Sequence, residues 1–344
     1  MKAVRKTQRG AGFVELVEIE EPVIADDEVL IEVKAVAICG SDLHIYQDEH
    51  PYWPPVTMGH EFSGQIAAVG RSVSGWQVGD RVVSETRTES CGRCRYCQSG
   101  SPQICPEKRP LGIGVNGAMA RYIATPARLL HRMPDTLSYD EASLVEPTAI
   151  CIHSLLERTG VVAGESVVIC GAGPIGLLSL QIAKAAGAAP IVVTGTPRSA
   201  NLKLRKARDL GADYVVNIGE EDPQPKVLEL TEGYGADLVI EASGASSAIA
   251  QSFPMVRRHG KICAIGVSGK PTVAVPWDVA IFKAPQVTFC FSSSWTSWET
   301  ALSLLARGAI RAEPLITHRA PLADWEDIFQ AMINGQVIKA ILHP

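Results

Sequence analysis

The pattern of hydrophobic and polar residues changes character along the chain. In the first 148 residues, short apolar or alternating segments are separated by Gly, Pro and Asp. The segment 29–37 (VLIEVKAVA) alternates and then runs apolar, and further strands are expected at 64–69, 81–84 and 121–125. This part of the sequence therefore predicts a compact, mostly β unit.

From about residue 167, apolar strands alternate with helical segments. Strands are expected at 166–170, 190–194, 214–217, 238–241, 261–266 and 287–291, and helices at 174–186 and 199–210. Strands that alternate with helices favour a parallel, doubly wound α/β sheet.

After about residue 292 this alternation ends, and helices are expected at 298–306 and 324–334. No low-complexity linker separates the parts, so we expect the C-terminal segment to return to the first domain. The predicted domains are 1–150 together with 292–344, and 151–291.

Composition is that of a folded protein. The 344 residues include 32 Lys and Arg and 37 Asp and Glu, which gives a formal net charge of −5, and 46% of residues are hydrophobic. A length of about 150 residues per domain suggests two domains. These values exclude a mainly disordered chain, and the mild acidity argues against a nucleic-acid binder.

No apolar run reaches the ~20 residues that a membrane span needs. The basic N-terminal segment 1–10 lacks the apolar stretch of a signal peptide, so a cytoplasmic location is expected. An odd number of cysteines, nine, also disfavours disulfides.

A glycine-rich motif, Gly171-Ala-Gly173-Pro174-Ile175-Gly176, follows an apolar strand and opens a helix. In this context it indicates a dinucleotide site: the glycines allow a tight turn and close approach of a pyrophosphate, which the helix N-terminus attracts. A plain glycine-rich turn is the alternative.

The residues after the second strand bear on the type of cofactor. NAD-binding proteins usually place an acid there for the ribose hydroxyl, but this segment reads Gly195-Thr196-Pro197-Arg198 and has no acid before Asp209. Arg198 could pair with a 2′-phosphate, so NADP is expected to be preferred or accepted. The alternative is that these basic residues form a solvated helix face, and this interpretation is favoured for residues 203–208.

Four cysteines lie within fifteen residues, at Cys91, Cys94, Cys97 and Cys105. Four thiolates from one polar loop are typical of a structural zinc site; an iron–sulfur cluster is the alternative. The remaining Cys151, Cys170, Cys263 and Cys290 lie in apolar segments and are expected in the core.

A second, more scattered set contains Cys39, His60, Glu61 and Glu146. One Cys, one His and one or two Glu could form a catalytic zinc site with an open position. Spacing alone leaves core and surface roles open for Cys39 and the two glutamates.

Taken together, the motifs resemble the zinc-containing medium-chain dehydrogenases, and within them the polyol (sorbitol-type) and threonine dehydrogenase branch. The matching segments are 39–44 (CGSDLH), 59–62 (GHEF), 79–82 (GDRV), the four-cysteine loop, 146–147 (EP), 171–176 and 339–344 (KAILHP). The resemblance implies a GroES-like, mostly β catalytic domain and a Rossmann cofactor domain.

The resemblance also implies residue roles. Cys39 and His60 would bind the catalytic zinc, with Glu61 and Glu146 as alternating further ligands or as partners of its water. Ser41 and His44 match a proton relay, so the expected catalytic residues are Ser41, His44 and Glu61. The residues expected to contact the cofactor are Gly171, Gly173, Pro174, Ile175, Gly176, Gly195, Thr196, Arg198, Gly266 and Lys339.

The implied reaction is oxidation of an alcohol, with zinc as Lewis acid and hydride transfer to the nicotinamide. A polyol, sugar alcohol or cyclitol is the expected substrate class, and a tetramer the expected assembly. Threonine dehydrogenases carry a His where this chain has Thr88, which disfavours an amino-alcohol substrate. A catalytically silent NAD(P)-binding protein is the alternative outside enzymes.

Overall fold

The computed structural model describes all residues from Met1 to Pro344. The chain divides into two compact units. Unit 1 comprises Met1–Glu146, Ser294–Arg307 and Ala312–Pro344, and unit 2 comprises Pro147–Ser293 and Gly308–Arg311.

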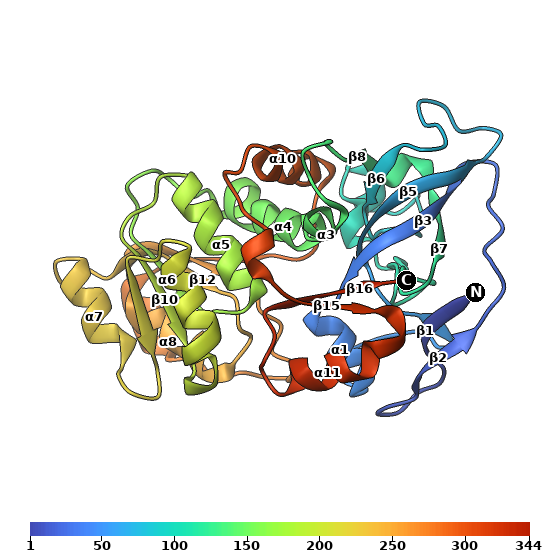
Figure 1. Cartoon of the computed structure of the whole chain (residues 1–344). Coiled ribbons are helices and arrows are strands. Elements are labelled where there is room, and N and C mark those ends of the chain that lie inside the picture. The colour runs from blue at the N-terminus through green and yellow to red at the C-terminus, as the bar shows by residue number, and fades with distance from the viewer. The chain divides into compact units, whose positions relative to one another are not determined.

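Unit 1 is built on a seven-stranded sheet with the path β15-β16-β3-β5-β6-β8, and β7 also pairs with β3. Its strands are β3 (Glu28–Ala37), β5 (Glu61–Val69), β6 (Arg81–Ser84), β7 (Tyr122–Pro126), β8 (Leu130–Arg132), β15 (Ile316–Pro321) and β16 (Lys339–His343). A three-stranded sheet contains β1 (Lys2–Lys6), β2 (Val14–Glu18) and β4 (Val56–Thr57). Figure 1 shows β16, from the end of the chain, beside β3 from its beginning.

The helices of unit 1 are short and lie around these sheets. They are α1 (Gly40–Tyr46), α2 (Arg95–Gln98), α3 (Tyr139–Ser143), α10 (Trp295–Ala306) and α11 (Trp325–Ile333). On α11, Trp325, Ile328 and Phe329 are buried and join the core formed by the apolar faces of β3 and β5. This core fixes the ends of β3 and β5, where the candidate metal ligands lie.

Unit 2 contains a six-stranded parallel sheet in the order β11-β10-β9-β12-β13-β14. The strands are β9 (Val167–Cys170), β10 (Ile191–Gly195), β11 (Tyr214–Asn217), β12 (Ala236–Glu241), β13 (Val256–Ala264) and β14 (Gln286–Phe289). The strand order reverses between β9 and β12, and such a switch point is where ligands bind in open α/β sheets. The predicted parallel, doubly wound sheet is confirmed.

Helices connect these strands. They are α4 (Val145–Ile152), α5 (Pro174–Ala185), α6 (Arg205–Asp209), α7 (Pro223–Leu230), α8 (Ser246–Met255) and α9 (Trp277–Lys283), and a π-helix spans His153–Thr159. The helix predicted at 199–210 is interrupted: a 3₁₀ turn at Pro197–Ser199 and a π-helix at Ala200–Leu204 precede α6. β13 begins at Val256, before the predicted 261, because the chain enters this strand directly from α8.

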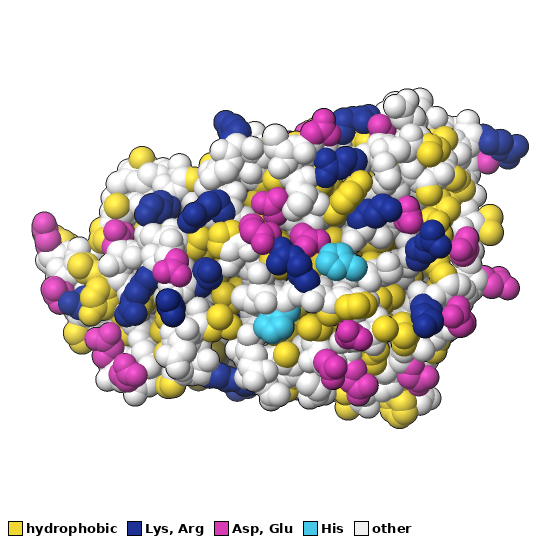
Figure 2. Space-filling view, in the orientation of Figure 1, with side chains coloured by type: hydrophobic (Ala, Val, Ile, Leu, Met, Phe, Trp, Pro, Cys, Tyr) yellow, Lys and Arg dark blue, Asp and Glu magenta, His cyan; other side chains and the backbone are white.

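No helix of the structure is long and apolar enough to cross a membrane. On the face shown in Figure 2, lysine and arginine side chains are interspersed with acidic ones and do not form one continuous basic patch.

Candidate functional site

The four cysteines of the loop after β6 gather around one point. Their sulfur atoms all lie within 4.8 Å of one another. The Sγ atom of Cys91 is 4.0 Å from that of Cys97 and 3.6 Å from that of Cys105. Zinc–sulfur bonds of ~2.3 Å in tetrahedral geometry place sulfur atoms about 3.8 Å apart, so this set fits a zinc ion.

Backbone N–H groups donate hydrogen bonds to the sulfur atoms of this cluster. The N–H groups of Cys91 and Cys94 donate to the sulfurs of Cys105 and Cys91, at 3.5 and 3.3 Å. The Cys91 donor contributes most to holding the pKa of Cys105 at about 7, whereas burial and the neighbouring thiols raise the pKa of Cys97 to about 12. Thiolate and thiol thus share one compact cluster, as expected where a metal ion would replace the protons.

A second cluster lies where β3 and β5 meet. Ala37 and Glu61 are paired across these strands, and Cys39, two residues after the end of β3, caps the N-terminus of α1. This pairing brings a sulfur of Cys39, a ring nitrogen of His60 and a carboxylate oxygen of Glu61 within 4.8 Å of one another. Three of the four residues expected at the catalytic zinc are therefore together.

Glu146, the fourth expected ligand, lies outside that 4.8 Å set but interacts with it electrostatically. Burial, added to by the charge of Glu61, raises the pKa of the Glu146 carboxyl to about 7. The Glu146 carboxyl therefore interacts electrostatically with the cluster but is not one of its closest candidate metal ligands.

Sequence reasoning missed the role of Asp42. Its carboxylate is fully buried; Oδ2 accepts a hydrogen bond from the N–H of Cys39 at 2.9 Å, and Oδ1 is 3.7 Å from Nδ1 of His60. Although burial works against it, the Asp42 charge raises the pKa of His60 well above its ordinary value. The available signal was an acid three residues after Cys39, the residue that caps the N-terminus of α1.

Lys339, expected at the cofactor, is buried in the same cluster. Its ammonium group donates to the Glu61 carboxylate and to the carbonyl of Ile38. Burial disfavours its charge, but Glu61 and Cys39 raise the pKa of Lys339 above its usual value. The lysine thus neutralises part of the negative charge of the cluster.

Three buried polar atoms of this cluster have no hydrogen-bond partner. They are Oδ1 of Asp42, Nδ1 of His60 and Oε1 of Glu61. Oδ1 of Asp42 and Nδ1 of His60 face each other at 3.7 Å, which leaves Oε1 of Glu61 as the atom that faces no such partner. Buried polar groups are almost always satisfied, so this oxygen beside the Cys39 thiol and the His60 imidazole fits a site built to hold a metal ion.

The two residues expected to relay protons lie on α1. The Ser41 hydroxyl is 3.4 Å from Nε2 of His60, and Nδ1 of His44 is 2.9 Å from the carboxylate of Glu49. His44 is half exposed. The helix therefore carries one polar group beside the cluster and another at the surface.

The glycine motif adopts the geometry that a dinucleotide site requires. Gly171 has φ +111°, and a Cβ atom at Gly176 would lie 1.8 Å from the carbonyl oxygen of Gly171. A Cβ atom at Gly173, the residue that begins α5, would meet nothing within 4 Å. Open space at Gly173 and crowding at Gly176 match their separate roles in phosphate approach and helix packing.

Glu241 holds the neighbouring loop and was not anticipated. Its carboxylate accepts from the N–H groups of Ser243 and Gly244, and a Cβ atom at Gly266 would lie 2.4 Å from it. Ser243 in turn packs against Gly171. This carboxylate fixes the ends of β12 and β13 beside the glycine motif.

The turn after β10 carries Arg198, the cation expected to contact the cofactor. Gly195 is crowded by Leu204 and Ser199, and Thr196 begins the turn that carries Arg198. Burial, together with the charge of Arg198, lowers the pKa of Lys203. Two basic residues therefore lie near each other where an acid is absent.

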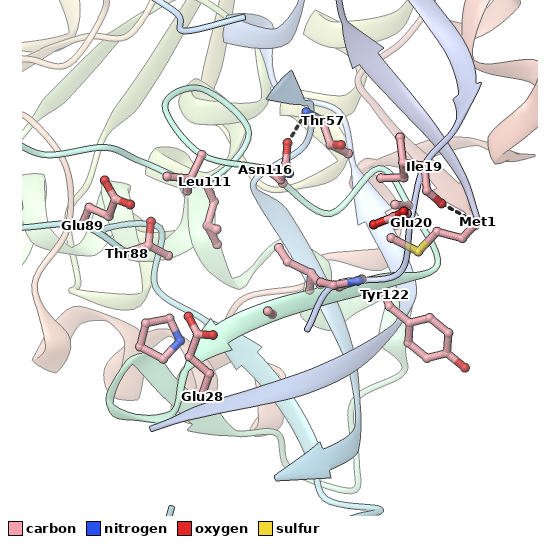
Figure 3. A pocket seen from close by; sticks show the side chains of 17 residues that line it. Met1, Ile19, Glu20, Glu28, Thr57, Thr88, Glu89, Leu111, Asn116 and Tyr122 are labelled. Carbon is pink, nitrogen blue, oxygen red and sulfur yellow. Dashed lines mark hydrogen bonds between the residues drawn. The ribbon is translucent and has the colours of Figure 1, made fainter. Parts of the chain in front are cut away.

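Each unit also has a hollow, and that of unit 2 is lined in part by Glu241 and by Gly266, one of the residues expected to contact the cofactor. In unit 1 a cavity of about 280 Å³ is lined by Thr57, Asn116 and three glutamates, with a hydrogen bond between Thr57 and Asn116 (Figure 3). In unit 2 an apolar cavity of about 590 Å³ lies beside β13 and β14. Neither cavity is lined by the zinc candidates.

Comparisons with known proteins agree with this geometry. Residues 25–135 match the family described as alcohol dehydrogenase GroES-like domain, and residues 174–307 match that described as zinc-binding dehydrogenase. These matches confirm the predicted combination of a GroES-like unit with a Rossmann unit.

Similar proteins are named as dehydrogenases. The chain is 38% identical to a sorbitol dehydrogenase of Halalkalibacterium halodurans, covering 100% of this chain and 99% of the relative. It is 37% identical to a D-arabitol-phosphate dehydrogenase of Enterococcus avium (99% and 97%) and 36% identical to an L-threonine 3-dehydrogenase of Pyrococcus horikoshii (99% and 98%). A zinc-binding dehydrogenase of Sinorhizobium meliloti, solved with NADP, superimposes with a TM-score of 0.92 at 31% identity, covering 100% of this chain and 99% of that one. The chain belongs to the zinc-binding medium-chain alcohol dehydrogenase family, in its polyol and threonine dehydrogenase branch.

Proposed function

We propose that this protein is a zinc-dependent dehydrogenase that transfers a hydride between NAD(P) and a secondary alcohol of a polyol, sugar alcohol or cyclitol-like substrate. The observation that carries the proposal is the cluster of Cys39, His60 and Glu61 at the β3–β5 junction. The named relatives that act on sorbitol and arabitol phosphate favour the polyol class.

In this proposal Cys39 and His60 hold the catalytic zinc, and Glu61 and Glu146 supply further oxygen ligands. The bound zinc would act as a Lewis acid that lowers the pKa of the substrate hydroxyl. Asp42 orients the ring of His60 through its Nδ1 side. Lys339 compensates the charge of Glu61 and so limits the cost of burying that carboxylate. Cys91, Cys94, Cys97 and Cys105 hold a second, structural zinc.

The same residues suggest where the substrate proton goes. Ser41, beside His60, accepts the proton and passes it toward His44 at the surface, where Glu49 holds the imidazole.

Unit 2 binds the cofactor, which takes up the hydride. Gly171, Gly173 and Gly176, with Pro174 and Ile175, receive the pyrophosphate at the N-terminus of α5. Gly195, Thr196 and Arg198 would contact the adenosine ribose, and Gly266 and Lys339 would complete the set of cofactor-binding residues. NADP is expected to be preferred, because Arg198 pairs with a 2′-phosphate and no acid repels it. A kcat/KM for NAD more than tenfold above that for NADP, or about 1.4 kcal/mol, would overturn this preference.

The proposal extends to organisation and location. The proposed catalytic domain, 1–150 with 292–344, corresponds to unit 1, and the proposed cofactor domain, 151–291, corresponds to unit 2; the boundaries differ by a few residues, and 308–311 belong to unit 2. A homo-oligomer, as a tetramer, is supported by the edge strand β14 and by α9, where Trp277, Phe282 and Phe289 are 69%, 70% and 77% exposed. Sedimentation of a monomer at all concentrations would refute it. Nine free cysteines agree with a reducing cytoplasm.

The main test is a steady-state screen of polyols, cyclitols and amino alcohols with both cofactors. Turnover of a polyol by the wild type, lost in Cys39→Ser and His60→Ala while cofactor binding by fluorescence titration is kept, would support the proposal. Loss of cofactor binding in the same variants would contradict the assigned roles. A silent binding protein would show no turnover and would hold one zinc per chain instead of two.

An amino-alcohol substrate such as threonine is the second candidate, favoured by the threonine dehydrogenase relative. At position 88 the hydroxyl of Thr88 is buried and donates to the carbonyl of Arg109 at 2.8 Å. This position therefore offers no titratable group, which supports the polyol over the amino alcohol. The same screen decides between them.

A further inference from the structure

Two cysteines of unit 2 that no part of the proposed function uses lie side by side. Cys263 is in β13, and Cys290 follows the last residue of β14. Their sulfur atoms are 3.8 Å apart. Both sulfurs also approach the carbonyl oxygen of Ser154, at 3.7 Å for Cys263 and 3.8 Å for Cys290.

These three atoms form a nearly equilateral triangle. A tetrahedral ion with metal–sulfur bonds of ~2.3 Å and metal–oxygen bonds of ~2.1 Å separates two sulfurs by about 3.8 Å and a sulfur from an oxygen by about 3.6 Å. The triangle therefore has the dimensions of one face of such a site. Its sulfur–sulfur distance of 3.8 Å lies within the range of 3.6 to 4.0 Å found in the four-cysteine loop.

A fourth candidate donor, the hydroxyl oxygen of Thr159, interacts with the two thiols of this triangle. The hydroxyl of Thr159 is buried and has no hydrogen-bond partner, and it interacts with both thiols, lowering the pKa of each. Ser154 and Thr159 both belong to the π-helix His153–Thr159. Such helices are rare and often mark functional sites, and an unpaired buried hydroxyl has a free-energy cost that a ligand would remove.

A direct disulfide fits the backbone less well. Cys263 is paired in register with Thr288, so Cys290 lies two residues further along the neighbouring strand. With parallel strands ~4.8 Å apart and a rise of ~3.3 Å per residue, diagonal neighbours of this kind have Cα atoms about 8 Å apart, beyond the usual range for a disulfide. An ion between the sulfurs requires no such approach.

The thiols are also in a suitable state. Hydrogen bonding from Cys263 contributes most to lowering the pKa of Cys290, to about 6, while the pKa of Cys263 is raised by Cys290 and by burial. The two sulfur atoms therefore interact directly with each other, and metal binding would displace thiol protons from the pair.

We propose that Cys263, Cys290 and the carbonyl of Ser154 form a third metal site, for a thiophilic divalent cation of the Zn²⁺ and Cd²⁺ class, with Thr159 as the nearest further donor. This site is independent of the zinc ions assigned to unit 1, since all of its donors belong to unit 2.

The test is a titration of the zinc-replete full-length protein with Cd²⁺ alone. Total bound zinc plus cadmium per chain is measured by elemental analysis, together with the ultraviolet charge-transfer absorption of thiolate–cadmium bonds. We expect the wild type to hold one equivalent more than Cys290→Ser and Cys263→Ser. Equal metal content in wild type and variants would overturn the proposal.

Cys170→Ser is the matched control, because Cys170 is a buried thiol of the same sheet, 4.0 Å from the hydroxyl of Ser252. It should keep the extra equivalent. Cys290 is only half-buried, so its serine variant should fold even where that of buried Cys263 does not. As a second readout, Cd²⁺ should raise the melting temperature of the wild type and of Cys170→Ser by more than that of Cys290→Ser; the same rise in all three would also overturn the site.

Discussion

The ammonium group of Lys339 donates to the carboxylate of Glu61, although 278 residues separate them in the chain. The contact joins β16 to the first residue of β5 and is almost fully buried on both sides. It links the packing of the C-terminal strand to the electrostatics of the candidate metal cluster.

We therefore expect Lys339→Met to lower the free energy of unfolding by about 3–5 kcal/mol, because it leaves a buried carboxylate without its partner. Urea unfolding at matched zinc content measures this. The double variant Lys339→Met/Glu61→Gln should recover much of the loss, since the charge that needed a partner is gone. Strictly additive losses would contradict a direct coupling.

The four-cysteine loop should contribute stability through its metal. Cys94→Ser removes one of four thiolates, so the variant should lose one zinc per chain and its melting temperature should fall by on the order of 5 °C or more. Elemental analysis and calorimetry measure the two effects. Cys151→Ser, outside the loop, should keep its zinc, and an unchanged melting temperature in Cys94→Ser would argue against a structural ion.

Asp140 predicts an acid-dependent loss of stability. Although burial opposes it, hydrogen bonds from His343 and Arg319 lower the pKa of this carboxyl. Because the pKa is lower in the folded state, the ionised carboxyl stabilises the protein at pH values above its unfolded-state pKa of ~3.9. This stabilisation is lost as the pH falls through the folded-state pKa.

Asp140→Asn should accordingly cost about 1–2 kcal/mol at pH 7, and the difference from wild type should vanish as the pH falls below about 4. Unfolding curves at several pH values measure this. Glu313→Gln, which removes a more exposed partner of Arg319, should have a smaller effect. A difference that persists undiminished at low pH would refute the assignment.

Lys6 holds the loop that follows β1. Its side chain is fully buried and donates to the carbonyls of Gly10 and Gly12, with Tyr46 as a longer contact at 3.4 Å. Lys6→Met should destabilise the protein by about 2–3 kcal/mol, because charged hydrogen bonds are lost and buried carbonyls remain. Lys2→Met, at an exposed position of the same strand, should change stability by less than about 0.5 kcal/mol.

Local patterns predicted much of the fold. The strands of unit 2 are continuous apolar runs and the glycine motif sets its own turn, so β9, α5 and β10 were predicted within a residue or two. The four-cysteine cluster was predictable for the same reason, since all of its atoms come from one short loop.

What depends on distant pairing was not predictable. β16 has no strong pattern of its own, and it is a strand because β3 and β15 lie on either side of it. The burial of Lys339 against Glu61 and the approach of Cys263 to Cys290 follow from sheet registers rather than from spacing. Cys263 and Cys290 were expected only to fill the core, and their mutual contact had no sequence signal.

The position of β16 also has a consequence for the order in which the protein is made. Unit 2 is an almost continuous stretch, so nearly all of it leaves the ribosome before the C-terminal tail is translated. The central sheet of unit 1, in contrast, lacks an inner strand until residues 339–343 have been synthesised. The early ligands Cys39 and His60 must therefore wait until residues 339–343 have been synthesised before Lys339 can complete their surroundings. A chain truncated before residue 339 would leave that cluster unfinished.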